Sequence, residues 1–266
     1  MDWNKTKTIF IMVFLILDIF LLYQFIEKRN SSKYDLMSKT STEDLIKEDD
    51  IKYVNMPKES LKEKFLIAKS KVFEKKDIQE LQNQKVQILS GGTQIRGTFK
   101  NKISLSDKFQ SNQLDTYLKG NILNGDQYRF WSYDKTNNVL IYYQYADNKT
   151  FFNNSKGKLK LFLNDNREIA SYEQTFLEGI NEQSNKEKEI LPASQAIENL
   201  YIDGDIPAKS EVKAELGYYN SLQSSSVSNL LIPTWRITVN DKKDLFVNAF
   251  DGEIIELNTE EKILLE

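Results

Sequence analysis

The longest apolar segment of the chain runs from Thr8 to Ile26 and reads TIFIMVFLILDIFLLYQFI. At a rise of about 1.5 Å per residue, this segment forms a helix of about 28 Å, which matches the hydrocarbon thickness of a bilayer. A cleaved signal peptide would have a shorter apolar core followed by small residues, whereas Glu27, Lys28 and Arg29 follow this segment. The pattern therefore predicts a retained transmembrane helix over residues 8–26.

The orientation of this helix is not decided by the flanking charges, because basic residues lie on both sides of it. Residues 1–7 precede the helix, and no second apolar segment of this length follows it. We therefore expect a single-pass cell-membrane protein with residues 1–7 in the cytoplasm and the C-terminal region outside the cytoplasmic membrane.

One ionisable residue, Asp18, lies at the centre of the apolar segment. A carboxyl group there costs about 2.5 to 3.5 kcal/mol on insertion scales, which the surrounding Ile, Leu, Phe and Val residues offset. Asp18 either forms a hydrogen bond with another membrane helix or is protonated and tolerated. On a helix it shares one face with Phe14, Leu15, Leu21 and Leu22. We predict that this face contacts a partner helix through Asp18, because the segment contains no small residues for close backbone approach.

Residues 27–50 are rich in Ser, Thr, Lys and acidic residues, which predicts a solvated linker. Its acidic end lacks the glycine and the alternating spacing of a calcium-binding loop. Pro57 then opens a segment in which apolar residues recur at helical spacing, which predicts the first amphipathic helix of the soluble region. These apolar residues are Leu61, Phe65, Ala68 and Val72.

Beyond residue 110, a helix followed by four strand-like segments occurs twice. The first helix follows Ser111, and its four strands are Tyr128–Tyr133, Val139–Tyr145, Lys158–Leu163 and Ile169–Phe176. The second helix begins at Pro192, and its strands are Val212–Tyr219, Trp235–Asn240, Asp244–Phe250 and Glu253–Leu257. The predicted fold class is α+β: a transmembrane helix and then two similar extracytoplasmic units of a helix plus a four-stranded antiparallel sheet, over residues 51–180 and 190–266.

Turn residues and strand patterns refine this prediction. Gly91–Gly92 and Asp251–Gly252 are dipeptides typical of tight hairpins, the second as a two-residue loop. The segment Val139–Ala146 is apolar on both faces, which indicates a central strand. Its aromatic neighbours form either a ligand platform or a packed core, and we favour the core. These aromatic residues are Tyr128, Phe130, Trp131, Tyr133, Tyr142, Tyr143 and Tyr145.

Composition narrows the chemistry available to the chain. With 36 basic and 39 acidic residues the net charge is −3, which argues against nucleic acid as a partner. The chain has no Cys and no His, which excludes thiolate nucleophiles, imidazole bases and the usual zinc ligands. Ser155 and Lys158 form an S-x-x-K string, but it lies in a Gly-containing loop and lacks the companion motifs of penicillin-recognising enzymes. We therefore predict no catalytic residue, metal site or cofactor.

Four segments of the chain carry a family resemblance. They are MDWNKTKTIFI at the N-terminus, LGYY at Leu216–Tyr219, PTWRI at Pro233–Ile237 and FVNAFDGEI at Phe246–Ile254. Together they resemble the YycI (WalI) family of membrane-tethered regulatory proteins. The resemblance implies a non-enzymatic regulator of the sensor histidine kinase YycG (WalK) that acts with YycH and is linked to cell-wall homeostasis. It also implies that the membrane helices of the three proteins associate. Asp18 is not part of a family motif. Its predicted role rests only on the cost of a carboxyl group in the membrane and on helix geometry.

Two other function classes are compatible with the sequence. The first is a membrane-anchored extracytoplasmic module that binds a wall or peptide ligand on its aromatic sheet. The second is an anchored hydrolase that uses Ser155 and Lys158.

Overall fold

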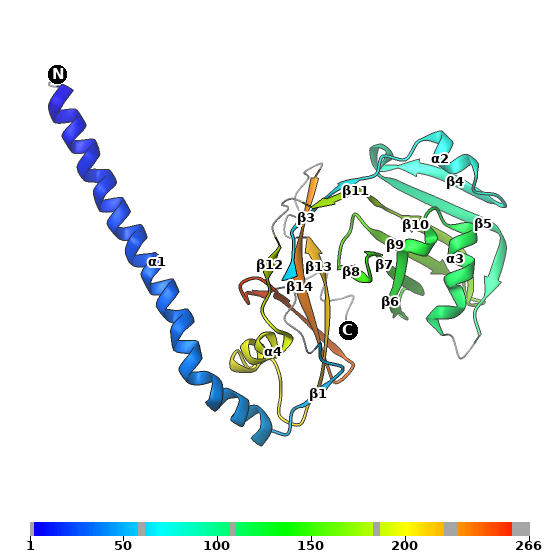
Figure 1. The fold of residues 1–266 in the computed structure, drawn as a ribbon. Coiled ribbons are helices and arrows are strands. Elements are labelled where there is room, and N and C mark those ends of the chain that lie inside the picture. The colour runs from blue at the N-terminus through cyan, green and yellow to red at the C-terminus, as the bar shows by residue number, and fades with distance from the viewer. Residues whose placement is uncertain (1–2, 58–61, 107–109, 183–186, 221–227, 257–266) are drawn as a thin grey trace. The chain divides into compact units, whose positions relative to one another are not determined.

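The computed structural model of the chain describes residues 3–57, 62–106, 110–182, 187–220 and 228–256. The chain divides into two compact units: residues 1–51 with 207–209, and residues 52–206 with 210–266. The first unit is built on a single helix, α1 (Trp3–Glu48), drawn in blue in Figure 1. The second unit, called the sheet unit below, is mixed α+β and contains the large, mainly antiparallel sheet.

Helix α1 continues through the segment expected to be a linker. Its 46 residues correspond to a length of about 69 Å. Residues 27–48 contain no Gly or Pro, so they extend a helix that the apolar segment has already nucleated. The helix ends in a Schellman arrangement, in which the Ile51 amide donates to the Ile46 carbonyl and Asp50 adopts a left-handed conformation with φ 53°.

The first half of the sheet unit is an antiparallel sheet in the order β6-β7-β9-β10-β5-β4. Two short helices, α2 (Lys75–Gln79) and α3 (Asp115–Asn121), accompany it (Figure 1). Its strands are β4 (Gln84–Leu89), β5 (Gln94–Ser104), β6 (Tyr128–Asp134), β7 (Val139–Ala146), β9 (Lys158–Leu163) and β10 (Glu168–Gln174).

The second half contains a sheet in the order β11-β3-β14-β13 and helix α4 (Ala193–Ile202). Strand β15 pairs with another part of β14, and β16 pairs with β15. Strand β1 pairs with β13 in parallel, and β2 (Lys62–Glu63) forms a separate pair with β12 (Lys188–Glu189). The remaining strands are β1 (Lys52–Val54), β3 (Leu66–Ser70), β11 (Leu177–Glu182), β13 (Glu211–Asn220), β14 (Ser228–Val239), β15 (Lys243–Asn248) and β16 (Ile254–Ile255).

Strand β8 (Lys149–Phe152) joins the two halves into one sheet. It pairs antiparallel with β7 through Thr150 and parallel with β13 through Phe151 and Phe152. Both phenylalanines are fully buried. Each half therefore shares hydrogen bonds and apolar packing with the same short strand.

The strand patterns seen in the sequence are confirmed. Six consecutive residues of β7, Val139–Gln144, are buried, as expected for a central strand. The predicted strand at residues 158–163 also forms, as β9, and its buried leucines alternate with the partly exposed Lys158, Lys160 and Phe162. In the second half, α4 begins after Pro192, as predicted, and it buries Ala193, Ala196, Ile197 and Leu200.

The prediction of a helix after Pro57 is wrong. Residues 66–70 form strand β3, which lies between β11 and β14 and obtains backbone hydrogen bonds from both. Ala68 is fully buried there, whereas Val72 is 56% exposed, so the residues do not share one apolar face. The apolar sequence at Leu66 and Ile67 suits a strand with neighbours on both sides, and that pairing prevails over the weak helical spacing. Leu61 lies outside the described residues.

The two predicted hairpins differ in outcome. Strands β4 and β5 are joined by a tight turn in which Gly91 and Gly92 have φ values of 65° and 98°, as predicted. The hairpin at Asp251–Gly252 forms, with Gly252 at φ 78°, but its loop is longer than two residues because the last strand pair is Val247 with Ile254. The loop contains more residues because Ala249 stays next to β14, where its amide donates a hydrogen bond to the Pro233 carbonyl.

Candidate functional site

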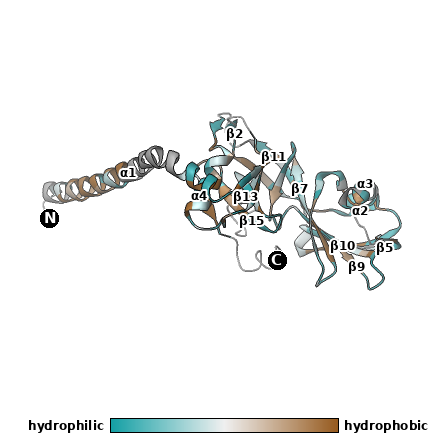
Figure 2. Cartoon of the chain, turned by 90° about the horizontal axis from the view of Figure 1, so that it is seen from below, coloured by the Kyte–Doolittle hydropathy of each residue, from teal (hydrophilic) through white to brown (hydrophobic). Residues whose placement is uncertain are grey.

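The anchor segment is the first candidate site. Within the residues that the structure describes, Lys7–Ile26 of α1 is the helical segment long and apolar enough to cross a membrane. Apolar residues, brown in Figure 2, run along this part of α1. Its side chains are exposed in the chain by itself, which is compatible with a single-pass anchor surrounded by lipid or partner helices.

The regular geometry of α1 brings the five predicted contact residues together. Asp18 lies three or four residues from each of Phe14, Leu15, Leu21 and Leu22, so all five share one helix face. The four apolar side chains are 54–59% exposed, and Asp18 is also exposed. The arrangement provides one carboxyl group with apolar neighbours above and below it, and its role as a partner contact stays a prediction.

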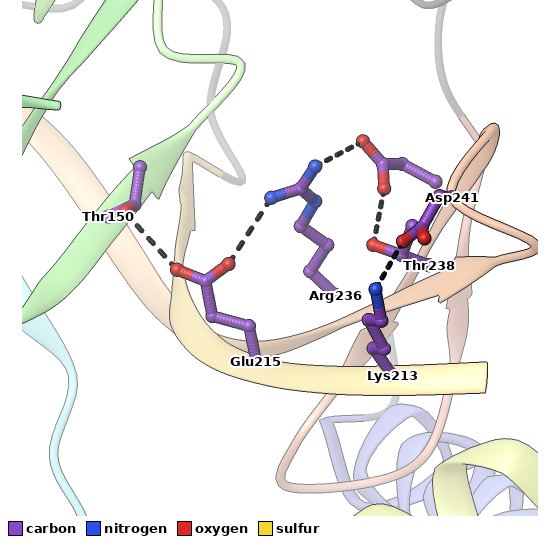
Figure 3. Close-up of polar contacts among 7 residues, drawn as sticks. Thr150, Lys213, Glu215, Arg236, Thr238 and Asp241 are labelled. Atoms are coloured by element: carbon purple, nitrogen blue, oxygen red, sulfur yellow. Dashed lines mark hydrogen bonds and ion pairs between the residues drawn. The ribbon is translucent and has the colours of Figure 1, made fainter. Parts of the chain in front are cut away.

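A second candidate site lies on the sheet unit around Arg236 of β14 (Figure 3). The Arg236 guanidinium donates from Nη1 to Glu215 Oε2 at 3.2 Å and from Nη2 to Asp244 Oδ2 at 2.7 Å. The Thr238 hydroxyl donates to the second oxygen of Asp244 at 2.7 Å, and Thr150 of β8 lies 3.5 Å from Glu215. Strand register explains this placement, because Glu215 is paired with Arg236 and Thr238 with Asp244.

Arg236 also connects the two halves of the sheet unit through an aromatic ring. Its guanidinium carbon lies 4.0 Å from the centroid of the Trp131 ring on β6. The same ring is 5.9 Å from the Phe152 ring and 6.5 Å from the Phe246 ring, measured between centroids. We call these residues, together with Glu215 and Asp244, the Arg236 junction.

The contacts of the Arg236 junction suit a structural link between strands better than a catalytic site. Both carboxylates are paired with a cation, and Asp244 has only 9% of its side chain exposed. Arg129 of β6 adds a second cation, 3.7 Å from Glu215, and stacks 4.7 Å from the Tyr145 ring centroid. These contacts hold strands of both halves in one arrangement.

Sequence reasoning missed the Arg236 junction. Arg236 and Phe246 lie within segments that carry the family resemblance, and Trp131 was placed among the core aromatics. No pattern in the sequence indicated that β6 would meet β14. The core interpretation of the aromatic set is confirmed for Tyr128, Tyr142 and Tyr143, which are at most 5% exposed.

Ser155 and Lys158, the two residues of the S-x-x-K sequence, both contact neighbouring residues of the sheet unit. The Ser155 carbonyl accepts a hydrogen bond from the Thr175 hydroxyl at 2.8 Å, and the Lys158 ammonium lies 5.3 Å from the centroid of the Tyr143 ring. Among the described residues, no group of three or more acidic side chains is arranged to hold a metal ion.

Comparison with known proteins assigns the chain to a family. Among solved structures, an uncharacterized protein from Eubacterium rectale ATCC 33656 is 11% identical, with a TM-score of 0.47 over 79% of this chain and 92% of that chain. YycH from Bacillus subtilis is 14% identical, with a TM-score of 0.37, and the match covers 74% of this chain but 53% of YycH. No curated protein matches the chain at a significant level. Residues 30–250, most of the chain, match the sequence profile of the family described as YycI protein. The chain therefore belongs to the YycI family.

Proposed function

We propose that the chain is a non-enzymatic, membrane-tethered regulator of a two-component sensor histidine kinase of the YycG (WalK) type. In this proposal it acts together with YycH and contributes to cell-wall homeostasis. Membership of the YycI family, over residues 30–250, is the observation that carries the proposal.

The anchor segment supplies a physical route for the regulation. A carboxyl group facing lipid in the middle of a bilayer is costly, so Asp18 is more stable where another helix offers a hydrogen-bond donor. The apolar residues on the same face, Phe14, Leu15, Leu21 and Leu22, would then pack against that helix. To change kinase activity, the contact has to be stronger in one signalling state of the kinase than in the other.

The same proposal places residues 1–7 in the cytoplasm and the sheet unit outside the membrane. The sheet unit would then contact the extracytoplasmic parts of the kinase or YycH. Its Arg236 junction keeps strands of both halves in register, which suits a surface that must present a fixed shape.

We also infer that the sheet unit consists of two similar halves, each built from a helix followed by four antiparallel strands. In the first half α3 precedes β6, β7, β9 and β10, and in the second α4 precedes β13, β14, β15 and β16. In both cases the four strands pair in sequence order, which supports the inference.

The test is recovery of the kinase with the tagged full-length chain from detergent-solubilised membranes. The Asp18→Leu variant is expected to recover about three- to tenfold less kinase, given the measured strength of polar contacts between membrane helices. Asp18→Asn, which keeps hydrogen-bonding capacity, is expected to retain most of the recovery. Phe20→Leu is the control, because residue 20 lies on the opposite helix face.

Equal recovery with wild type and Asp18→Leu would remove Asp18 from the contact. Failure of the wild-type chain to recover any histidine kinase would contradict the proposed function itself.

A further inference from the structure

A polar depression of about 320 Å³ lies on the sheet unit, next to the turn between β4 and β5 and the loop that precedes β9. Three lysines, Lys156, Lys158 and Lys160, line it. Lys158 and Lys160 are two residues apart on β9 and therefore point to the same face of the sheet. Lys156 lies in the preceding loop and adds a third positive charge.

The charge balance of this depression differs from that of the chain as a whole. The chain has a net charge of −3, whereas the lining contains three lysines and one acidic residue, Glu173. Glu173 is already paired with Arg96, whose Nε donates to its Oε1 at 3.0 Å. Lys160 also has a longer-range electrostatic interaction with Asp134. Among the described residues, neither Lys156 nor Lys160 forms an ion pair within 4 Å. The depression is thus a local positive region on an acidic protein.

Hydroxyl groups complete the lining. Ser90 and Thr93 come from the turn between β4 and β5, and Ser155 comes from the loop. The Thr93 hydroxyl donates to the Ser90 carbonyl at 2.9 Å, and the Ser90 hydroxyl donates to Gln94 Oε1 at 3.1 Å. Each of these hydroxyl oxygens keeps the capacity to accept a hydrogen bond from a ligand.

The loop that carries Lys156 is held in place by buried side chains. Asn154, 1% exposed, accepts the Lys156 amide on its Oδ1 at 2.9 Å. The Gly157 carbonyl accepts the amide of the buried residue Gln144 at 2.8 Å. The lysines therefore project from a fixed backbone, and ligand binding need not order the loop.

We infer that this depression binds a phosphate ester of a polyol. Lysine ammonium groups are compact point charges that bind phosphoryl oxygens. The hydroxyl and amide groups nearby suit the hydroxyl groups of a polyol. The volume exceeds that of a single inorganic ion and lies at the lower end of small-ligand sites. This inference gives the sheet unit a ligand and does not depend on the kinase contact of the anchor.

The experiment is isothermal titration of the full-length chain in nonionic detergent. The main probe is a soluble oligomer of glycerol units linked by phosphodiesters, and uncharged dextran and inorganic phosphate are the comparison ligands. The glycerol phosphate oligomer is expected to bind more tightly than inorganic phosphate, and dextran is expected not to bind. The Lys158→Gln/Lys160→Gln double variant is expected to weaken binding at least tenfold.

The matched control is the Lys102→Gln/Lys242→Gln double variant, which removes the same charge from exposed positions away from the depression. Equal weakening in both double variants would overturn the inference, since it would show attraction by net charge alone. Equal binding of dextran, or no binding of either the oligomer or short-chain phosphatidylglycerol, would also overturn it. Circular dichroism spectra of both double variants are compared to confirm equal folding.

A further titration distinguishes the two sources of this chemistry. Short-chain phosphatidylglycerol, used below its micelle concentration, carries the same headgroup as a lipid. Tighter binding of this lipid than of the oligomer, lost in Lys158→Gln/Lys160→Gln, would support the site and assign the ligand to a membrane lipid. Kinase recovery with the same variant is expected to stay at the wild-type level, so failure of the ligand site and failure of the proposed function give different results.

Discussion

The guanidinium of Arg236 contacts both the Trp131 ring, with its carbon 4.0 Å from the ring centroid, and the Asp244 carboxylate, with Nη2 2.7 Å from Oδ2. Trp131 belongs to β6 in the first half of the sheet unit, and Asp244 belongs to β15 in the second. One side chain therefore joins segments separated by more than a hundred residues in sequence. Because Arg236 contacts Trp131 of the first half and Asp244 of the second, separation of the two halves would break the contact with Trp131.

Replacing Arg236 is expected to destabilise the sheet unit. In Arg236→Met, Asp244 loses its cation and retains the Thr238 hydroxyl, and we expect the free energy of unfolding to fall by about 2 kcal/mol. Urea unfolding of the detergent-solubilised chain, followed by circular dichroism, measures this change. Lys213→Met is the control, because Lys213 and Asp241 form an exposed ion pair worth less than about 0.5 kcal/mol. Equal effects of both substitutions would contradict the assigned importance of the Arg236 junction.

Gly97 of β5 is expected to tolerate no side chain. A Cβ atom there would lie 2.0 Å from Cε1 of Tyr172, which is itself fully buried. Gly97→Ala should therefore lower the free energy of unfolding by about 1 to 3 kcal/mol through overpacking. Gly120 of α3 has no atom within 4 Å of the same position, and Gly120→Ala should raise stability by about 0.5 to 1 kcal/mol through helix propensity. Thermal and urea unfolding of the two variants should change in opposite directions.

Gln144 acts as a substitute for a strand neighbour. Its amide donates from Nε2 to the Leu177 carbonyl at 2.8 Å and accepts the Leu177 amide on Oε1 at 2.8 Å, and both residues are fully buried. Gln144→Leu leaves two buried backbone groups without partners and should cost about 2 to 4 kcal/mol of unfolding free energy. Gln87→Leu, at an exposed position of β4, is the control and should change stability by less than about 0.5 kcal/mol. A loss below about 1 kcal/mol for Gln144→Leu would contradict this account.

Because several tyrosines are buried, we expect the fold to lose stability at alkaline pH. Burial raises the pKa of Tyr117 to about 12, and burial also raises the pKa of Tyr142, where Asp115 adds to the effect. Burial likewise raises the pKa of Tyr172, with a smaller contribution from Tyr117.

Each of these tyrosines has a higher pKa in the folded chain than in the unfolded chain. The stability that this difference contributes is complete below pH 10, the ordinary pKa of tyrosine, and is lost as the pH rises through the pKa of the folded state. The unfolding free energy should therefore decrease above about pH 10, by up to about 1.4 kcal/mol per pH unit for each such tyrosine. The measurement is phenolate absorbance together with circular dichroism as the pH is raised. These tyrosines should ionise only as the circular dichroism of the fold is lost. Ionisation of all 13 tyrosines near pH 10 in the folded chain would be the contradictory result.

Local patterns identified most of the strands. The two apolar faces of β7 identified it as a central strand, and Pro192 marked the start of α4. These features depend on residues close together in sequence, where side-chain periodicity is decisive. The helix expected after Pro57 failed because residues 66–70 are stabilised by β11 and β14, which lie far away in sequence.

The pairing of distant strands could not be predicted from one sequence. Periodicity shows which face of a strand is buried and does not identify its neighbour, so nothing indicated the parallel pairing of β8 with β13. The contact of Arg236 with Trp131 depends on that pairing and was missed for the same reason. Asp18 was recognisable because a carboxyl group in an apolar segment is a local anomaly.

The proposed regulation depends most directly on which face of the anchor segment meets the kinase. A photoactivatable crosslinking residue is placed in the full-length chain, in native membranes, at positions 14, 18 and 21 on the Asp18 face and at positions 16 and 20 on the opposite face. The account predicts that the first three positions capture a histidine kinase or YycH and that positions 16 and 20 capture much less. Equal capture around the helix, or capture of neither protein at any position, would contradict it.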